Sequence, residues 1–202
     1  MPAVVDHEHR RLHVARIAAD IIARVGIDAL TMRQIAAEAG FSTAIVTHYF
    51  SSKQELLLHT YRTAAANAQQ RLAAALDRDP CDLLGCIEAL LPRDDPSIQD
   101  WKVYLAFWHI AVLDPDFAAE QASQALNARR LFRSVLEARA GQGLPPAPAE
   151  FDAVARRLLV IVIGVAVQSV FDPVSWSPEV QREYLMAELG PLCHPAIETI
   201  NP

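Results

Sequence analysis

Hydrophobic positions recur every three or four residues along most of the chain, which is the spacing of one face of an α-helix. The clearest stripes predict helices over residues 7–25, 53–76, 117–140, 150–171 and 178–189. No segment shows the alternation of polar and apolar positions that a half-buried strand requires. With the shorter helices between these segments, one of which starts at Pro80, the pattern predicts an all-α protein of about nine helices.

Residues 30–53 predict two short helices joined by a tight turn. Thr31 is a helix-capping residue, and Gly40 stands where the end of the first helix needs a left-handed residue. Ser42 can cap a second helix that ends near Tyr49. The apolar positions expected to hold this helix against the first are Ile45, Val46, and Tyr49 or Phe50. Two short helices around a glycine-containing turn are typical of a DNA-binding helix-turn-helix.

The outer face of the second helix carries only small or hydrogen-bonding side chains, as a helix in a major groove requires. Ser51, Ser52 and Lys53 then begin a helix whose amide groups and lysine can meet a phosphate. Any one of these residues also suits an ordinary helical hairpin, but together they favour DNA binding. The predicted DNA-binding residues are Thr31, Arg33, Ser42, Thr43, Ala44, Thr47, His48, Tyr49 and Lys53.

The segment from Thr31 to Leu57, T-M-R-Q-I-A-A-E-A-G-F-S-T-A-I-V-T-H-Y-F-S-S-K-Q-E-L-L, resembles the N-terminal domain of the TetR-type transcriptional repressors. Two positions depart from it: that family usually has glycine in place of Ala44 and tyrosine in place of Thr47. Both lie on the expected DNA-reading surface, so no operator sequence is carried over. The resemblance implies a three-helix DNA-binding domain over residues 1–52 and a larger helical ligand-binding and dimerisation domain over residues 53–202.

A second informative segment begins at Ser97, a possible helix cap, and is apolar nearly all round. Such a helix is expected to run through the middle of its domain. Its aromatic side chains on one side are explained by core packing, but they also suit the wall of a small-molecule pocket. The predicted pocket residues are Trp101, Tyr104, Leu105, Trp108, Phe132 and Gln168.

Two strings in this half, W-K-V-Y-L-A-F-W and A-L-N-A-R-R-L-F-R-S-V-L, are similar to the TetR subgroup that contains the choline/betaine-pathway repressor. The resemblance implies a quaternary ammonium effector, which Trp101, Tyr104 and Trp108 would attract through cation–π contacts. A bulky hydrophobic effector is the competing possibility. We expect no cofactor.

The chain is 52% hydrophobic and 21% charged, an apolar excess that needs an oligomer interface, an interior pocket, or both. TetR-like repressors pair the last two long helices of each ligand domain with their copies in a second subunit. By this resemblance the homodimer interface would contain Leu158, Ile161, Val162, Val165, Gln168 and Leu185. A two-fold dimer suits a palindromic double-stranded operator with half-sites about one helical turn, ~34–36 Å, apart.

The net charge of −6 permits DNA binding once its distribution is considered. Residues 1–55 hold six basic and six acidic groups, so the excess negative charge lies entirely in the rest of the chain. Arg10, Arg11, Arg33 and Lys53 are placed where phosphates could lie. No signal peptide is visible, and the longest apolar run, residues 158–167, is too short to cross a bilayer. We therefore expect a cytoplasmic protein without a membrane partner.

The sequence gives little support for an enzymatic, redox or metal-binding site. No nucleophile–base pair, carboxylate pair or glycine-rich phosphate loop points to an enzyme. The three scattered cysteines, Cys81, Cys86 and Cys193, are expected to be buried thiols. We expect a disordered arm without a metal site at His7, His9 and His13, and a solvated face at Arg129, Arg130, Arg133 and Arg139. A DNA-binding regulator without small-molecule control remains an alternative.

Overall fold

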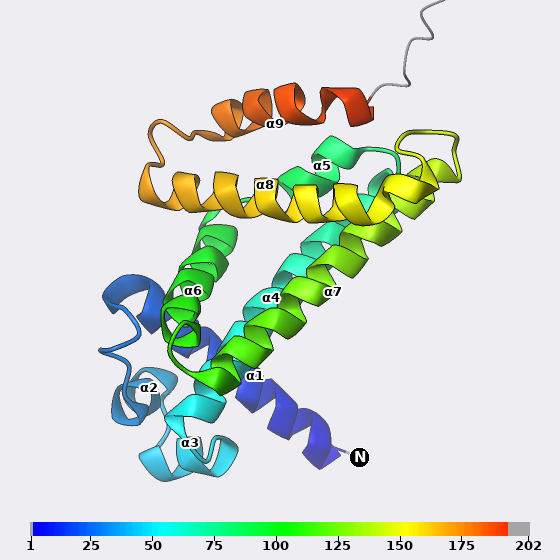
Figure 1. Cartoon of the computed structure of the whole chain (residues 1–202). Coiled ribbons are helices and arrows are strands. Elements are labelled where there is room, and N and C mark those ends of the chain that lie inside the picture. The colour runs from blue at the N-terminus through cyan, green and yellow to red at the C-terminus, as the bar shows by residue number, and fades with distance from the viewer. Residues whose placement is uncertain (1, 194–202) are drawn as a thin grey trace, which may run out of the picture. The chain divides into compact units, whose positions relative to one another are not determined.

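The computed structural model describes residues 2–193, with side chains described for residues 7–190 and 192. Within that range the regular structure is entirely helical, as predicted (Figure 1). Nine α-helices and one short 3₁₀ helix follow one another: α1 (Pro2–Val25), α2 (Met32–Ala39), α3 (Thr43–Tyr49), α4 (Lys53–Arg78), α5 (Leu83–Glu88), α6 (Asp95–Ala111), α7 (Pro115–Ala140), η1 (Pro148–Glu150), α8 (Phe151–Phe171) and α9 (Pro178–Cys193).

The described residues form two compact units. The N-terminal unit comprises residues 2–67 and 98–122, and the C-terminal unit comprises residues 68–97 and 123–193. The long helices α4 and α7 each contribute residues to both units. The helix that follows the helix-turn-helix is therefore continuous across the unit boundary.

One hydrophobic cluster holds the N-terminal unit together. It draws side chains from α1, α2, α3, α4, α6 and α7, including the buried residues Ile21, Ile35, Val46, Phe50, Leu56, Tyr61, Phe107 and Phe117. Full burial of one large apolar side chain stabilises the fold by about 1.5–3 kcal/mol. The short helix α3 is held in place by this packing, because seven residues are too few to form a stable helix alone.

The local signals around the helix-turn-helix act as predicted. Thr31 Oγ1 accepts a hydrogen bond from Gln34 N at 3.1 Å, and Ser42 Oγ accepts one from Ile45 N at 3.3 Å. Gly40 ends α2 with φ of 68°, in the left-handed region that costs glycine nothing. Thr31 thus sets the start of α2, and Gly40 and Ser42 set the turn between α2 and α3.

Three predicted boundaries were wrong. Helix α1 extends to Pro2, so the expected disordered histidine-rich arm is helical. Helix α5 begins at Leu83 rather than Pro80, because the Asp82 carboxylate caps it by accepting from Gly85 N at 2.8 Å. Helix α6 begins at Asp95, before Ser97. The residue that caps α6 is Asp94, whose Oδ1 accepts from Ser97 N at 2.8 Å.

Arg139 is not part of a solvated face, as the sequence pattern had suggested. Its side chain is 1% exposed, and it donates to the Cys81 carbonyl and, at 2.5 Å, to the Leu192 carbonyl. It thereby ties the segment before α5 to the last turn of α9 within the C-terminal unit. A buried guanidinium is costly unless it is hydrogen-bonded, and these two carbonyls pair its two terminal nitrogens. Arg133, by contrast, forms a surface ion pair with Asp152 at 2.6 Å.

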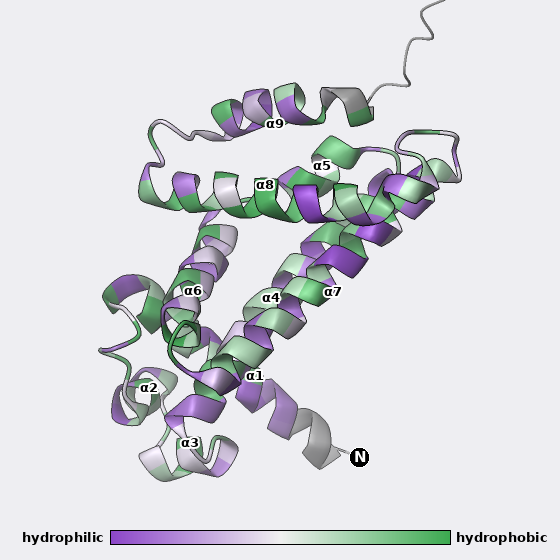
Figure 2. Ribbon diagram, viewed as in Figure 1, coloured by the Kyte–Doolittle hydropathy of each residue, from purple (hydrophilic) through white to green (hydrophobic). Residues whose placement is uncertain are grey.

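Helix α8 is the most apolar helix of the chain (Figure 2). The stretch Pro148–Phe171 is long and apolar enough to cross a membrane, so the ten-residue run underestimated the length of this segment. A third of its most apolar window is buried in the protein, and core helices of soluble proteins also have this length and composition. The remaining apolar surface of α8 is available to a partner.

Candidate nucleic-acid interface and aromatic cluster

The outer face of α3 presents the side chains that the sequence pattern placed there. Thr43, Ala44, Thr47 and His48 are all exposed. On the opposite face Val46 is fully buried, and Phe50 is buried immediately after the helix. Ile45 was predicted to face inward, but it is 38% exposed. Since successive helix residues are turned by about 100°, burial of Val46 leaves Ile45 at the edge of the packed face.

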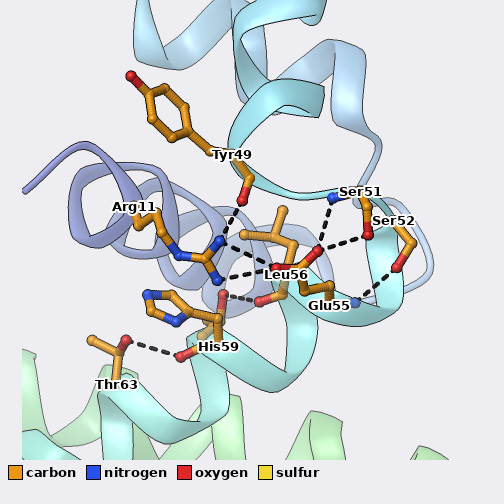
Figure 3. Close-up of polar contacts among 9 residues, drawn as sticks. Arg11, Tyr49, Ser51, Ser52, Glu55, Leu56, His59 and Thr63 are labelled. Atoms are coloured by element: carbon orange, nitrogen blue, oxygen red, sulfur yellow. Dashed lines mark hydrogen bonds and ion pairs between the residues drawn. The ribbon is translucent and has the colours of Figure 1, made fainter. Parts of the chain in front are cut away.

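Arg11 on α1 is a structural link to the end of α3 (Figure 3). Its Nη1 donates to the Tyr49 carbonyl at 2.5 Å, and both terminal nitrogens lie 3.1 Å from Glu55 Oε1. The guanidinium carbon also lies 4.4 Å from the centroid of the Phe50 ring. The sequence pattern suggested a phosphate contact for Arg11, whereas the structure places its charge against the carboxyl end of α3.

Glu55 completes this link on the first turn of α4. Its Oε2 accepts from both the backbone N and the hydroxyl of Ser51 at 2.8 Å, while Ser52 Oγ accepts from Glu55 N at 3.0 Å (Figure 3). These hydrogen bonds from Ser51, with a smaller contribution from Arg11, hold the pKa of Glu55 below its ordinary value. The middle of α1, the end of α3 and the start of α4 are therefore joined through two charged side chains.

We expect a Glu55→Gln variant to lose part of the stability gained above pH 4.5. A carboxyl group whose pKa is lowered by folding stabilises the protein above its unfolded pKa, and this stabilisation disappears as pH falls through the folded pKa. Urea unfolding at pH 6 should show a lower free energy of unfolding for the variant than for the wild type. The two free energies should converge as the pH falls below the pKa of Glu55 in the folded protein. If the difference in unfolding free energy between the two proteins stays the same down to pH 3, the proposed role of Glu55 is contradicted.

Some of the remaining predicted DNA-binding residues are exposed, and others are buried or half-buried. Thr31, Arg33 and Ser42 are exposed. Lys53 is half-buried, and its Nζ donates to the Ile27 carbonyl at 3.1 Å. Tyr49 is buried, and its hydroxyl accepts from Arg10 Nη1 at 3.3 Å. Tyr49 and Lys53 thus hold neighbouring segments together in this structure.

His7 on α1 lies beside α3, a contact that the sequence pattern did not predict. Its ring centroid lies 4.8 Å from that of Tyr49 and 6.1 Å from that of His48. His7 stands at the start of the predicted helix over residues 7–25, but no signal in the sequence indicated that its ring lies beside Tyr49. Among the described side chains, no group of three or more histidine, cysteine or acidic residues could hold a metal ion.

Three of the predicted pocket residues come together on α6. The ring centroids of Trp101 and Tyr104 are 5.3 Å apart, those of Trp101 and Trp108 are 6.1 Å apart, and Tyr104 stacks on Trp108 at 6.4 Å. We call these three residues the aromatic cluster. Trp101 is buried, whereas Tyr104 and Trp108 are half-buried.

The other three predicted pocket residues do not belong to the aromatic cluster. Leu105 is half-buried on α6. Phe132 and Gln168 belong to the C-terminal unit, where Phe132 is buried and Gln168 is exposed. The sequence pattern missed Gln121 on α7, whose Oε1 accepts from Trp108 Nε1 at 2.6 Å and from the Tyr61 hydroxyl. A single glutamine in a polar stretch of helix gives no signal in the sequence that it would accept hydrogen bonds from two other helices.

The predicted dimer residues lie mostly inside the C-terminal unit. Leu158, Val162, Val165 and Leu185 are buried, Ile161 is half-buried and Gln168 is exposed. The exposed large apolar side chains on α8, α9 and the segment between them are Val160, Phe171, Val174, Val180, Tyr184 and Met186. Of the six predicted residues, only Ile161 and Gln168 therefore keep exposed surface in the single chain.

The described cysteines do not form a disulfide. Cys86 is buried and Cys81 is half-buried, while the side chain of Cys193 lies outside the described residues. Burial, reinforced by Asp82, raises the pKa of the Cys86 thiol to about 11. A thiol so far from ionisation is a packing residue rather than a nucleophile.

The chain matches two family profiles and is similar to curated relatives over nearly its whole length. Residues 16–60 match the profile of bacterial regulatory proteins of the tetR family, and residues 82–194 match that of the BetI-type transcriptional repressor C-terminal domain. It is 28% identical over 197 residues to the HTH-type transcriptional regulator PksA of Bacillus subtilis, covering 96% of this chain and 94% of the relative. It is 34% identical over 154 residues to the HTH-type transcriptional regulator BetI of Burkholderia thailandensis, covering 74% and 76%.

A solved structure shows the same fold. A transcriptional regulator from Saccharomonospora viridis, determined in complex with choline, has a TM-score of 0.77 and 23% identity, covering 91% of this chain and 97% of that one. The two profiles and the BetI relative together cover both the helix-turn-helix and the helical C-terminal region. The chain belongs to the TetR family of transcriptional regulators, with a C-terminal domain of the BetI type, and is a regulator rather than an enzyme.

Proposed function

We propose that this regulator represses transcription as a homodimer on a palindromic operator and is released by a small molecule that carries a quaternary ammonium group. The observation that carries the proposal is the polar, exposed face of α3, in the same unit as a partly exposed aromatic cluster. The first feature suits a base-reading helix and the second suits a cationic effector. A cytoplasmic location accompanies this role.

The proposed base-reading residues are Thr43, Ala44, Thr47 and His48. Thr47 Oγ1 lies 3.1 Å from the carbonyls of both Thr43 and Ala44, so its proton is engaged within the helix. Its methyl group and an oxygen lone pair remain for a thymine methyl or a base amino group. Thr31, Arg33, Ser42 and Lys53 would contact the phosphate backbone, with Lys53 exchanging the Ile27 carbonyl for a phosphate.

The proposed effector site is the aromatic cluster. A desolvated cation over the face of tryptophan or tyrosine gains ~1–2 kcal/mol, and two of these rings are only half-buried. The choline complex of the Saccharomonospora viridis regulator supports a ligand of this class. A bulky hydrophobic effector is the alternative, because the same rings offer a large apolar surface.

The proposed dimer covers the exposed apolar side chains of α8, α9 and the segment that joins them. Phe171 and Val174 are 74% and 88% exposed, and Met186 on α9 is 56% exposed. Apolar side chains of this size and exposure are typical of an interface rather than of a free surface. Half-buried Ile161 and exposed Gln168 would lie at the same interface.

Release by an effector can be measured on a duplex that the protein itself selects from a randomised pool. We expect choline, glycine betaine or tetramethylammonium to weaken the operator complex by about 5–150-fold, the usual range of coupling between two sites. The Trp108→Leu variant should still bind the duplex but respond less. If no quaternary ammonium compound loosens the complex while an uncharged bulky hydrophobic compound does, the proposed effector class is wrong. If neither does, the protein is a DNA-binding regulator without small-molecule control.

A further inference from the structure

Oε1 of Gln121 on α7 joins the aromatic cluster to α4. It accepts hydrogen bonds from Trp108 Nε1 at 2.6 Å and from the hydroxyl of Tyr61. Trp108 lies on α6, and Tyr61 is buried on α4. Three helices of the N-terminal unit therefore meet at one acceptor atom.

The chemistry of the two donors fixes the orientation of the Gln121 amide. An indole N–H can only donate, so the atom that faces Trp108 must be oxygen. Burial raises the pKa of the Tyr61 hydroxyl to about 12, so it stays protonated at neutral pH and can also donate. Both lone pairs of the amide oxygen are then occupied, and neither donor can move away without losing its bond.

Tyr61 connects this acceptor to the DNA-binding end of α4. Its ring stacks on Phe107 with a centroid separation of 3.7 Å and meets the edge of Tyr104 at 5.5 Å. Helix α4 runs without interruption from Lys53 to Tyr61, a length of ~12 Å at 1.5 Å per residue. In its first turn Glu55 is bound to Arg11, which in turn holds the last carbonyl of α3. A change at Tyr61 can thus reach α3 through a rigid helix and two hydrogen-bonded side chains.

We propose that Gln121 is a positioning residue that couples an occupied aromatic cluster to the placement of α4, and through α4 to α3. The inference rests on the proposed function, because it assigns the coupling of that effector site. An effector beside Trp108 that displaces the indole withdraws its N–H from Gln121. The amide then turns, Tyr61 loses its acceptor, and the side chain that fixes α4 against α6 and α7 is freed.

The test compares three variants in the full-length protein. Gln121→Met keeps the size of the side chain but removes the acceptor, whereas Gln121→Glu keeps an acceptor oxygen. Gln54→Met is the matched control, since Gln54 Nε2 donates to Asp116 Oδ2 at 3.4 Å and so also joins α4 to α7, but at an exposed position. The measured quantity is the ratio of operator Kd with and without saturating choline, and tryptophan fluorescence reports choline binding separately.

We expect a ratio of about 5 or more for the wild type, Gln121→Glu and Gln54→Met. The ratio should fall to about 2 or less for Gln121→Met, although the fluorescence response of this variant to choline persists. If Gln121 only stabilised the fold, Gln121→Met would lower the thermal midpoint of unfolding but leave the ratio of operator Kd values unchanged. If Gln121→Met does not fold, Tyr61→Phe, which deletes one donor hydroxyl, should also lower the ratio.

Other outcomes would overturn the inference in distinguishable ways. A wild-type ratio in Gln121→Met would remove Gln121 from the coupling while leaving the proposed function intact. Loss of the fluorescence response in Gln121→Met alone would make Gln121 a ligand contact instead. If the wild type itself does not respond to choline or glycine betaine, the proposed function fails, and this inference fails with it.

Discussion

Replacing Thr47 with glutamate is expected to weaken operator binding by about 100-fold, equivalent to about 2.7 kcal/mol. Thr47 lies on the exposed face of α3, where a negative charge would meet phosphates and the acceptor-rich edges of bases. The change should scarcely affect stability, because exposed positions usually alter it by less than about 0.5 kcal/mol. Fluorescence anisotropy on the selected duplex measures the first effect, and urea unfolding measures the second.

The matched control for this change is Gln70→Glu, which adds the same charge at an exposed position on α4. It lies well along α4 and is expected to leave the operator affinity within about 3-fold of the wild type. If both variants lose affinity equally, the effect is one of overall charge. If neither loses affinity, α3 does not enter the duplex.

Replacing Arg11 with methionine should both destabilise the N-terminal unit and weaken operator binding by 10-fold or more. Loss of the guanidinium leaves the partly buried Tyr49 carbonyl without this partner, at a cost of at most about 1–3 kcal/mol, the range for a fully buried unsatisfied group. The ion pair with Glu55 adds little, because the Glu55 side chain is 38% exposed. The end of α3 then loses its link to α1 through Arg11, and its side chains meet the groove less well.

Arg16→Met provides the comparison on the same helix, since Arg16 is exposed. It should leave stability and operator affinity nearly unchanged. Had Arg11 been a phosphate ligand, as the sequence pattern suggested, Arg11→Met would weaken binding without destabilising the fold. A stable Arg11→Met protein would therefore contradict the link described here.

The helix-turn-helix was predictable because its signals are local. Capping by Thr31 and Ser42 and the left-handed Gly40 act over three or four residues, so each can be found from spacing alone. The helical content was predictable for the same reason. The helix starts that were wrong depended on which of two neighbouring polar residues supplies the cap, as with Asp94 before Ser97.

The contacts that organise the candidate sites were not predictable, because they join residues far apart in sequence. Arg11 meets the end of α3 nearly forty residues later, and Tyr61 shares an acceptor with Trp108 only through Gln121. Hydrophobic pattern also fails to tell which apolar residues of a buried helix face the core and which face a partner. In the single chain, Leu158 and Val162, two of the predicted interface residues, are buried, whereas Phe171 is exposed.

The central claim is that two copies of α3 enter one duplex, and selection of sequences from a randomised pool by the full-length protein tests it most directly. The account predicts an enriched inverted repeat whose half-sites lie about one helical turn apart, ~34–36 Å. It also predicts that the bound complex has the mass of two chains per duplex, or a small multiple of two. No enrichment, or a single half-site bound by one chain, would contradict the account.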